Sequence, residues 1–257
     1  MGQTRPVPPR ELQTQLMGCA QTSDCYRFRV TTIVIATRNA HKVGEIRTIL
    51  GGASQFLTLN DFPNPPKVVE DAGTFAGNAT KKAVELAHWL AATFPPTRRS
   101  SPLFVLADDS GLEVDALDGA PGVFSARFAA PDSAKSGNTS DADNNARLLH
   151  LLKDVPLEKR RARFHCVIAL VAIDSQTAIR NPQLFDGACE GRIGFAPRGK
   201  NDFGYDPLFK PVGFEQTFAE LGEDVKNRLS HRAKALEKLK AYFTTKQQRP
   251  KADSDCL

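Results

Sequence analysis

Two pairs of adjacent acidic residues, Glu70–Asp71 and Asp108–Asp109, are the strongest candidates for chemistry in this sequence. The second pair follows the apolar run LFVLA at 103–107, which predicts a buried strand ending at the carboxylates. Ligands of α/β proteins commonly bind at such strand ends, and carboxylates there suit Mg²⁺, which bridges them to substrate phosphates. Neighbouring strand residues point to opposite faces, so spacing does not decide which of the two faces a shared site. The alternative is a solvated strand end in which the following Ser-Gly forms a turn.

The segment ATRNAHK at 36–42 is a candidate phosphate-binding loop. It lies between an apolar strand predicted at 30–36 and a helix predicted from Val43 to Leu50. Backbone N–H groups at a helix N-terminus, together with the ammonium of Lys42, suit a phosphate. The GxxxxGK[ST] pattern of a Walker A loop is absent, so an ordinary turn into a helix is the alternative.

Three further groups have both a chemical and a structural interpretation. Asn78 and Lys82 are four positions apart and therefore share one face of a helix, most simply an exposed polar face. The turn DFGYDPLF at 202–209 contains aromatic rings that can stack on a base, although loop aromatics more often cover the core. The third group stands near the start of the last predicted helix and most simply lies at the surface: Lys226, His231 and Arg232.

An α/β fold is expected to position these residues, because strand-like apolar runs are mixed with helix-like periodic segments along the chain. Further strands are predicted at 165–173 and 184–195, and further helices at about 74–92, 140–152 and up to about Phe243. The helix at 74–92 should bury one apolar stripe: Ala79, Ala83, Leu86, Ala87 and Leu90.

Composition and charge exclude several classes of protein. Of the 257 residues, 41% are hydrophobic and 25% are charged, which is typical of a globular chain. No apolar run approaches the roughly 18 residues of a membrane-spanning helix. The net charge of +5 is concentrated at the ends, because 1–30 and 240–257 each contribute four basic and two acidic residues, leaving +1 for 31–239. A nucleic-acid-binding core is therefore not indicated.

The five cysteines form no CxxC pair and no zinc spacing, which favours a reducing, cytoplasmic setting. Residues 1–28 contain no secretory apolar core, although their arginines leave a transit peptide as an alternative to a disordered extension. We expect one domain at 29–243, followed by a disordered basic tail at 244–257.

In their residues and in their order along the chain, these motifs together resemble those of the inosine triphosphate pyrophosphatase family. Its members are the house-cleaning hydrolases of deaminated purine nucleoside triphosphates. The resemblance covers roughly residues 31–243. Its most specific part is ADDSGLEVDALDGAPGVFSARFA, and it continues in these segments: ATRNAHKVGEI, EDAGTFAGNATKKA, ARFHCVIAL, DFGYDPLF and SHRAKALEKL.

The resemblance implies a long curved mixed sheet flanked by helices, with two lobes and an active-site cleft between them. It also implies a homodimer and a requirement for Mg²⁺, for which Mn²⁺ is a possible substitute. Membership predicts that water attacks the α-phosphorus of ITP, dITP or XTP and releases a nucleoside monophosphate and pyrophosphate. No nucleic-acid or membrane partner is expected. The alternative is a catalytically silent, purine-nucleotide-binding regulatory protein.

The family's functional residues transfer to this sequence position by position. Glu70 and Asp109 would bind Mg²⁺, and Asp109 would also accept a proton from the attacking water. Lys82 would lie beside the phosphates and Ser110 would touch substrate. The triphosphate would be held by the loop of Thr37, Arg38, Asn39, Ala40, His41 and Lys42. The nucleoside would be surrounded by Phe203, Gly204, Tyr205, Asp206, Lys226, His231 and Arg232.

Four residues depart from the family pattern. Arg38 replaces a small residue in the phosphate loop, Gly77 replaces a frequent Glu, and Asn201–Asp202 replace glycines before FGYD. None of these changes removes a proposed ligand, so the expected consequence is limited to the substrate range.

Overall fold

The computed structural model describes residues 31–52, 54–94, 103–130, 137–174, 179–200 and 203–248. The expected extension at 1–28 and the segment 249–257 lie outside these residues, as does Asn201–Asp202. Within the described ranges, no helix is both long and apolar enough to cross a membrane.

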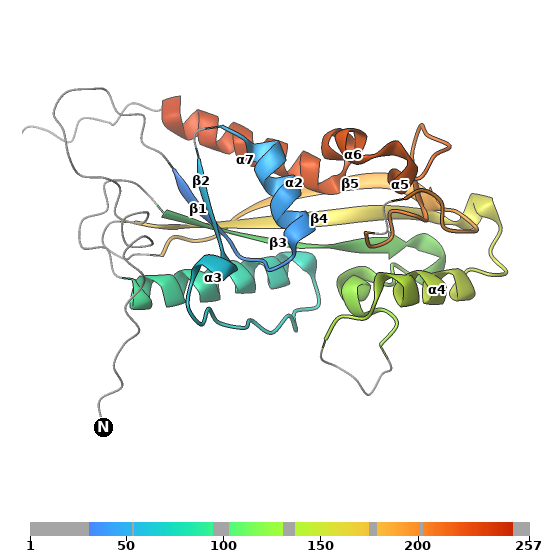
Figure 1. Cartoon of the computed structure of the whole chain (residues 1–257), viewed down its shortest axis with the longest axis horizontal. Helices are drawn as coiled ribbons and strands as arrows, with labels where there is room; N and C mark the ends of the chain where they lie inside the picture. Colours follow the sequence, from blue (N-terminus) through green and yellow to red (C-terminus); the bar gives the residue numbers. More distant parts are fainter. Residues whose placement is uncertain are drawn as a thin grey trace, which may run out of the picture.

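The centre of the molecule is one mixed sheet of six strands in the order β2-β1-β3-β4-β5-β6. β1 pairs in parallel with β2 and with β3, whereas β3, β4, β5 and β6 pair antiparallel. In Figure 1 the long strands β3, β4 and β5 extend along most of the molecule. The strands are β1 Thr32–Ile35, β2 Gln55–Thr58, β3 Leu103–Val114, β4 Arg161–Ile173, β5 Gln183–Ile193 and β6 Phe209–Pro211.

Helices cover both faces of this sheet. α3 and α4 lie on one side, and α2, α5, α6 and α7 lie on the other (Figure 1). The expected apolar stripe of α3 is buried in full. The α-helices are α2 Ala40–Leu50, α3 Phe75–Thr93, α4 Asp141–Leu151, α5 Phe218–Leu221, α6 Glu223–Leu229 and α7 His231–Gln248.

Within the described part of the chain, the buried apolar residues form three clusters. The first lies between α3 and the sheet, and the second lies between the opposite face and helices α2 and α7. The third occupies the other end of the long strands, where α4, α5 and β6 pack on β3, β4 and β5. The expected α/β fold with a long mixed sheet is therefore confirmed.

Polar side chains determine where the helices begin. The side chains of Asn39, Thr74 and Ser140 accept hydrogen bonds from backbone N–H groups in the first turns of α2, α3 and α4. Gly51 and Gly52 follow α2 with φ angles of 49° and 76°, which disfavour most other residues. The predicted starts of α3 and α4 are confirmed, because capping depends on a few local residues, whereas α2 begins at Ala40, three residues before the predicted Val43.

The prediction that the strand ends at the acidic pair is wrong. β3 continues to Val114, and β4 pairs with it throughout, with Asp109 opposite Val167 and Gly111 opposite His165. A side chain at Gly111 would bring its Cβ within 2.4 Å of the Gly122 carbonyl oxygen. Glycine here therefore allows the close approach of residues 122–125, instead of forming a turn.

The last predicted helix is two helices, because Ser230 adopts an extended conformation between α6 and α7. α7 also continues to Gln248, five residues beyond the predicted end at Phe243. The apolar periodicity fades before the helix does, and the hydroxyls of Thr244 and Thr245 donate to carbonyls of the preceding turn.

Candidate active site

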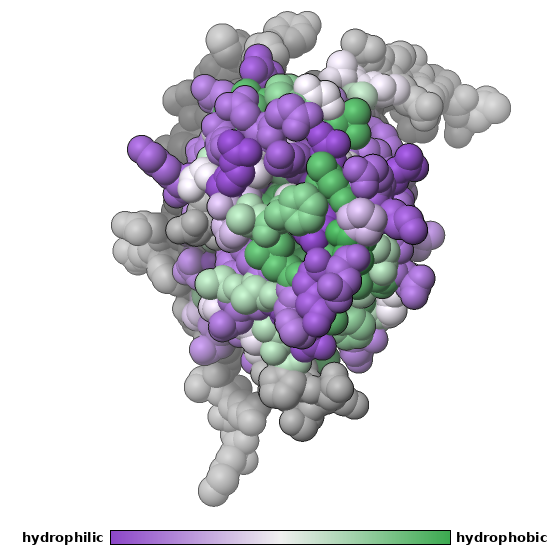
Figure 2. Space-filling view, turned by 90° about the vertical axis from the view of Figure 1, so that its right-hand side faces the viewer, coloured by the Kyte–Doolittle hydropathy of each residue, from purple (hydrophilic) through white to green (hydrophobic). Residues whose placement is uncertain are grey.

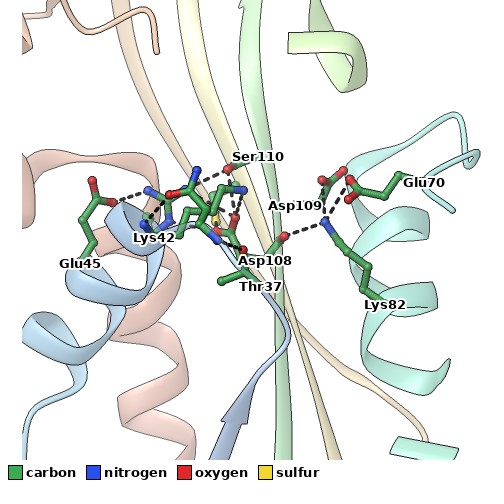
Figure 3. Close-up of polar contacts among 11 residues, drawn as sticks. Thr37, Lys42, Glu45, Glu70, Lys82, Asp108, Asp109 and Ser110 are labelled. Carbon is green, nitrogen blue, oxygen red and sulfur yellow. Dashed lines mark hydrogen bonds and ion pairs between the residues drawn. The ribbon is translucent and has the colours of Figure 1, made fainter. Parts of the chain in front are cut away.

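The middle of β3 places its two adjacent carboxylates on opposite faces of the sheet. Asp108 points toward α2 and α7, and Asp109 points toward α3 (Figure 3). Both are buried, with 2% and 6% of their surfaces exposed. Because successive side chains of a strand point to opposite faces, each carboxylate has a separate set of partners.

Asp108 joins the start of α2 to the C-terminal helix α7. Its carboxylate accepts hydrogen bonds from the ammonium of Lys42, from Arg232 Nε at 3.0 Å and from Ser110 Oγ at 3.1 Å. The thiol of Cys166, on the neighbouring strand, lies 3.0 Å from its second oxygen. Burial opposes the ionised form, but the two cations outweigh it and hold the pKa of Asp108 well below its usual value.

Residues 37–42 form a loop whose conformation is set by its own polar groups. Asn39 N–H donates to Thr37 Oγ1 at 3.1 Å, and Lys42 N–H donates to Asn39 Oδ1 at 3.1 Å. Ala40 begins α2, and the side chains of Arg38 and His41 are exposed. Lys42 points away from them to Asp108, so this loop presents both helix N–H groups and cations.

On the opposite face, Lys82 of α3 is placed between carboxylates. Its ammonium lies 3.0 Å from Asp109 Oδ1 and 3.2 Å from Glu70 Oε2, and it donates to the Asp108 carbonyl at 2.8 Å. Burial raises the pKa of Asp109 despite the neighbouring ammonium. Glu70 is more exposed, and Lys82 lowers its pKa against the opposing effect of partial burial.

The sequence interpretation of Asn78 and Lys82 as an exposed polar face is wrong. Asn78 is 1% exposed and Lys82 is 9% exposed, because this face of α3 packs against the segment that contains Glu70. Asn78 Oδ1 accepts from the Ala72 N–H at 2.9 Å. Gly77 permits the same approach, since a Cβ there would lie 2.7 Å from the Ala72 Cβ.

A cavity of about 380 Å³ lies over these groups. The loop at 37–42 forms one wall, and Glu70, Lys82 and Asp109 form another. Arg127, which sequence reasoning did not select, also lines the cavity and donates to the Glu70 carbonyl at 3.2 Å. Arg127 could have been selected from the sequence, because it belongs to the SAR segment at 125–127 of the most specific motif.

The predicted nucleoside-binding residues divide into two groups. Phe203 and Lys226 line a second cavity of about 250 Å³ between α2 and α6. The Lys226 ammonium lies 4.7 Å from the centroid of the Phe203 ring, and the His41 ring lies 4.8 Å from it. Lys226 is also 2.5 Å from Asp206 Oδ2, so Asp206 supports the cavity from behind.

Tyr205 and His231 are packed in the interior instead. Tyr205 belongs to the third apolar cluster, and its hydroxyl donates to the Ser125 carbonyl at 2.9 Å. The His231 ring stacks on Phe164 with 4.9 Å between centroids, and burial holds the pKa of His231 well below its usual value. Gly204 stands between Phe203 and Tyr205 in the chain at a φ angle of 57°, which explains a glycine in the turn.

Arg232 and Glu45 complete the polar centre. Arg232 is 2% exposed, and its guanidinium contacts Asp108, Ser110 Oγ at 2.9 Å and the carboxylate of Glu45. Sequence reasoning missed Glu45, although it stands three positions after Lys42 and therefore on the same face of α2.

The residues of the first cavity fit a divalent cation that is shared with a phosphate ligand. Among the described residues, no three His, Cys, Asp or Glu side chains group as a ready-made metal cage. Mg²⁺ does not require one, because it is commonly held by one or two carboxylates together with substrate phosphates. Asp109 Oδ2 is buried without a hydrogen-bond partner in the described part of the chain, which suits a metal ligand beside Glu70.

Comparison with known proteins gives consistent matches over most of the chain. A sequence model of the Ham1 family matches residues 33–242. A protein named dITP/XTP pyrophosphatase from Exiguobacterium sibiricum is 45% identical over 214 residues, which are 83% of this chain and 97% of the relative. One of the same name from Syntrophobacter fumaroxidans is 47% identical over 212 residues, covering 82% and 81%.

Solved structures match in the same way. The HAM1 protein from Coxiella burnetii superposes with a TM-score of 0.67 at 37% identity, covering 84% of this chain and all of the other. A nucleoside-triphosphatase, or dITP/XTP pyrophosphatase, from Mycobacterium abscessus gives a TM-score of 0.59 at 36% identity, with 81% and 98% covered.

Proposed function

This chain belongs to the Ham1 family, and we propose that it hydrolyses deaminated purine nucleoside triphosphates (ITP, dITP and XTP) to the nucleoside monophosphate and pyrophosphate. The names of the curated relatives support this substrate class. The observation that supports it most directly is the buried pair of Asp109 and Lys82 beside Glu70, facing a phosphate-type helix N-terminus across one cavity.

In this proposal the cavity of about 380 Å³ receives the triphosphate. The N–H groups and hydroxyl of the loop from Thr37 to Lys42, with the side chains of Arg38 and Lys82, neutralise the phosphate oxygens. Ser110 contributes a hydroxyl held between Asp108 and Arg232. Phosphoryl transfer needs little covalent help, so positioning and charge neutralisation provide most of the catalysis.

Asp109 is proposed as the proton acceptor for the attacking water. Burial raises its pKa, and a base with a pKa closer to the working pH accepts a proton more effectively. The Lys82 ammonium lies 3.0 Å from Oδ1 of Asp109, which leaves Oδ2 free to face water or a metal ion.

We propose that Glu70 and Asp109 hold Mg²⁺, with Mn²⁺ as a possible substitute. When bound, the ion would offset the negative charge of the phosphate groups during hydrolysis. The arrangement of two carboxylates and an open cavity supports this assignment.

Base selection is proposed for the pocket around Phe203 and Lys226. The 6-keto oxygen of hypoxanthine or xanthine accepts a hydrogen bond, whereas the 6-amino group of adenine is a donor and leaves a cationic donor unpaired. Lys226 lines the cavity and has such a donor. Arg232, predicted as a neighbour of the base, would act through Glu45, Asp108 and Ser110.

We further propose a homodimer in the cytoplasm. Figure 2 shows apolar residues gathered in the middle of one end of the molecule, surrounded by hydrophilic ones. Phe195 is 62% exposed and Val212 is 74% exposed. A contiguous exposed apolar patch is typical of surfaces that contact another chain. The buried free thiols of Cys166 and Cys189 are compatible with a reducing compartment.

The test is pyrophosphate release from dITP, XTP, dATP and dGTP, with and without Mg²⁺. We expect release from dITP and XTP far above that from the other two, and only with the metal. The Asp109→Asn variant is the matched control for contaminating activity. Nucleotide binding without turnover by the wild-type protein would support the regulatory alternative instead.

A further inference from the structure

Glu45 connects α2 to both C-terminal helices. One of its carboxylate oxygens lies 3.0 Å from the ammonium of Lys226 in α6, and the other contacts the guanidinium of Arg232 in α7. The side chain is 13% exposed. Burial opposes its ionisation, but Arg232 and Lys226 outweigh this and lower the pKa of Glu45. It is therefore a fixed negative charge between two buried cations.

The charges around Glu45 balance one another. From Glu45 the contacts continue through Arg232 to Asp108 and back to Lys42 on α2, and through Lys226 to Asp206. Three carboxylates therefore face three cations in one connected set that joins α2, β3, α6, α7 and the 203–206 turn: Glu45, Asp108 and Asp206 with Lys42, Lys226 and Arg232. Each member has a partner of opposite sign, so the removal of one charge leaves a net charge in a poorly hydrated region.

This balanced set borders the cavity between α2 and α6. Glu45 and Lys226 both line it, together with the Phe203 ring. Its volume of about 250 Å³ can contain a purine base, and Phe203 has the flat surface on which a base stacks. Any charge that the base itself bears would therefore interact with Glu45 and Lys226 directly.

We propose that Glu45 is a positioning residue that also sets the charge of the base pocket, and thereby determines how the enzyme ranks XTP against ITP. This inference rests on the proposed function. Xanthine in a nucleotide loses a proton near neutral pH and becomes an anion, whereas hypoxanthine stays neutral. The ionised carboxylate of Glu45 offsets positive charge that Lys226 and Arg232 would otherwise have in excess. The pocket therefore accepts both bases and gives the anionic base no large advantage.

The Glu45→Gln variant tests the proposal, because Gln keeps the size and loses the charge. We expect the ratio of kcat/KM for XTP to that for ITP to rise about fivefold or more, since one unit charge within several ångströms is worth this much at an intermediate dielectric. Both substrates are measured at about pH 7.5. Because both are measured on one preparation, the ratio does not depend on the fraction of folded enzyme. A structural role alone would lower both rates equally and leave the ratio unchanged.

Two further variants separate charge from shape. Glu45→Asp shortens the side chain and keeps the charge, so its rates should fall while the ratio stays near the wild-type value. Glu223 lines the same cavity but is exposed to solvent, and no ion pair joins it to a cation in the described structure. Glu223→Gln is therefore the matched control, with a ratio expected within about twofold of wild type because exposed charges are screened.

The outcomes distinguish this inference from the proposed function. If wild-type enzyme hydrolyses both XTP and ITP and Glu45→Gln leaves their ratio within about twofold, the inference is wrong and the function stands. A fall in the ratio, or an equal rise in Glu223→Gln, also contradicts it. If the wild-type enzyme hydrolyses neither nucleotide, the proposed function itself fails.

Discussion

Among the residues that the structure describes, two arginines are almost completely buried, and they differ in the chemistry of their partners. Arg160 and Arg232 are each 2% exposed. The guanidinium of Arg160 donates to the carbonyls of Leu152, Val155 and Gly194 at 2.6, 2.8 and 2.9 Å. These partners are neutral dipoles, the Phe195 ring lies 4.2 Å from the guanidinium carbon, and burial lowers the pKa of Arg160.

Arg232 has ionised partners instead. It contacts Asp108 and Glu45, and these carboxylates raise the pKa of Arg232 against the opposing effect of burial. The first arginine fastens the end of α4 to the turn after β5, where no catalytic group is proposed. The second belongs to the polar centre at β3. Burial of an arginine is thus not by itself a sign of a functional site, whereas the charge of its partners is informative.

The largest expected effect is on catalysis at the polar centre. Asp109→Asn keeps the size of the side chain but removes the proposed proton acceptor and one proposed anionic metal ligand, so kcat should fall roughly 10²–10⁴-fold. Nucleotide binding, measured by calorimetry, should persist, and the melting temperature should change little. A variant with near-normal kcat would remove Asp109 from the mechanism.

Asp108→Asn should act mainly on stability. It leaves Lys42 and Arg232 without their shared buried carboxylate, which costs roughly 3–5 kcal/mol of the free energy of unfolding. Chemical denaturation of this variant and of Asp109→Asn gives the comparison. The two adjacent residues should show opposite patterns, and a more stable Asp108→Asn would contradict the charge set described here.

Arg160→Met removes the buried guanidinium whose partners are backbone carbonyls. Three carbonyls lose their donor, and a buried acceptor left unpaired costs about 1–3 kcal/mol, so the free energy of unfolding should fall by at least that amount. Because the region is distant from the polar centre, kcat/KM measured well below the melting temperature should remain within about twofold of wild type. A large loss of kcat/KM in folded protein would show that the two ends of the sheet are coupled.

The smallest effect expected is a pH dependence of stability from His231. Its pKa in the folded protein lies well below that of the unfolded chain, because burial and the nearby Arg232 disfavour the protonated form. The unfolded chain therefore binds the proton first, and stability should fall as pH drops below about 6.5, by up to about 1.4 kcal/mol per pH unit. His231→Phe should flatten the curve between about pH 5 and 6.5, and an unchanged slope would assign it to other groups.

Local signals predicted much of this molecule. The polar residues Thr74 and Ser140 at the helix starts and the apolar stripe of α3 identify helices without knowledge of their neighbours. The burial of Lys82 was not predictable in this way, because it depends on the sheet and the Glu70 segment that α3 covers. Polar residues on a helix look the same in sequence whether they face water or carboxylates.

The division of roles between Asp108 and Asp109 likewise required the tertiary structure. Strand alternation predicts that they face opposite ways, but only the packing of α3 on one face and of α2 and α7 on the other gives each its partners. The length of β3 was underestimated because its second half contains several polar residues and one glycine, while pairing with β4 maintains the strand. Glu45 was missed because its meaning depends on Lys226 and Arg232, far away in the sequence.

The central claim is that this centre directs water to the α-phosphorus of a deaminated purine nucleoside triphosphate. Hydrolysis of dITP in ¹⁸O-labelled water, with Mg²⁺ and with the products analysed by mass spectrometry, tests it directly. The account predicts label in the nucleoside monophosphate and unlabelled pyrophosphate, with no turnover in Asp109→Asn. Label in pyrophosphate, or release of single phosphates, would contradict it.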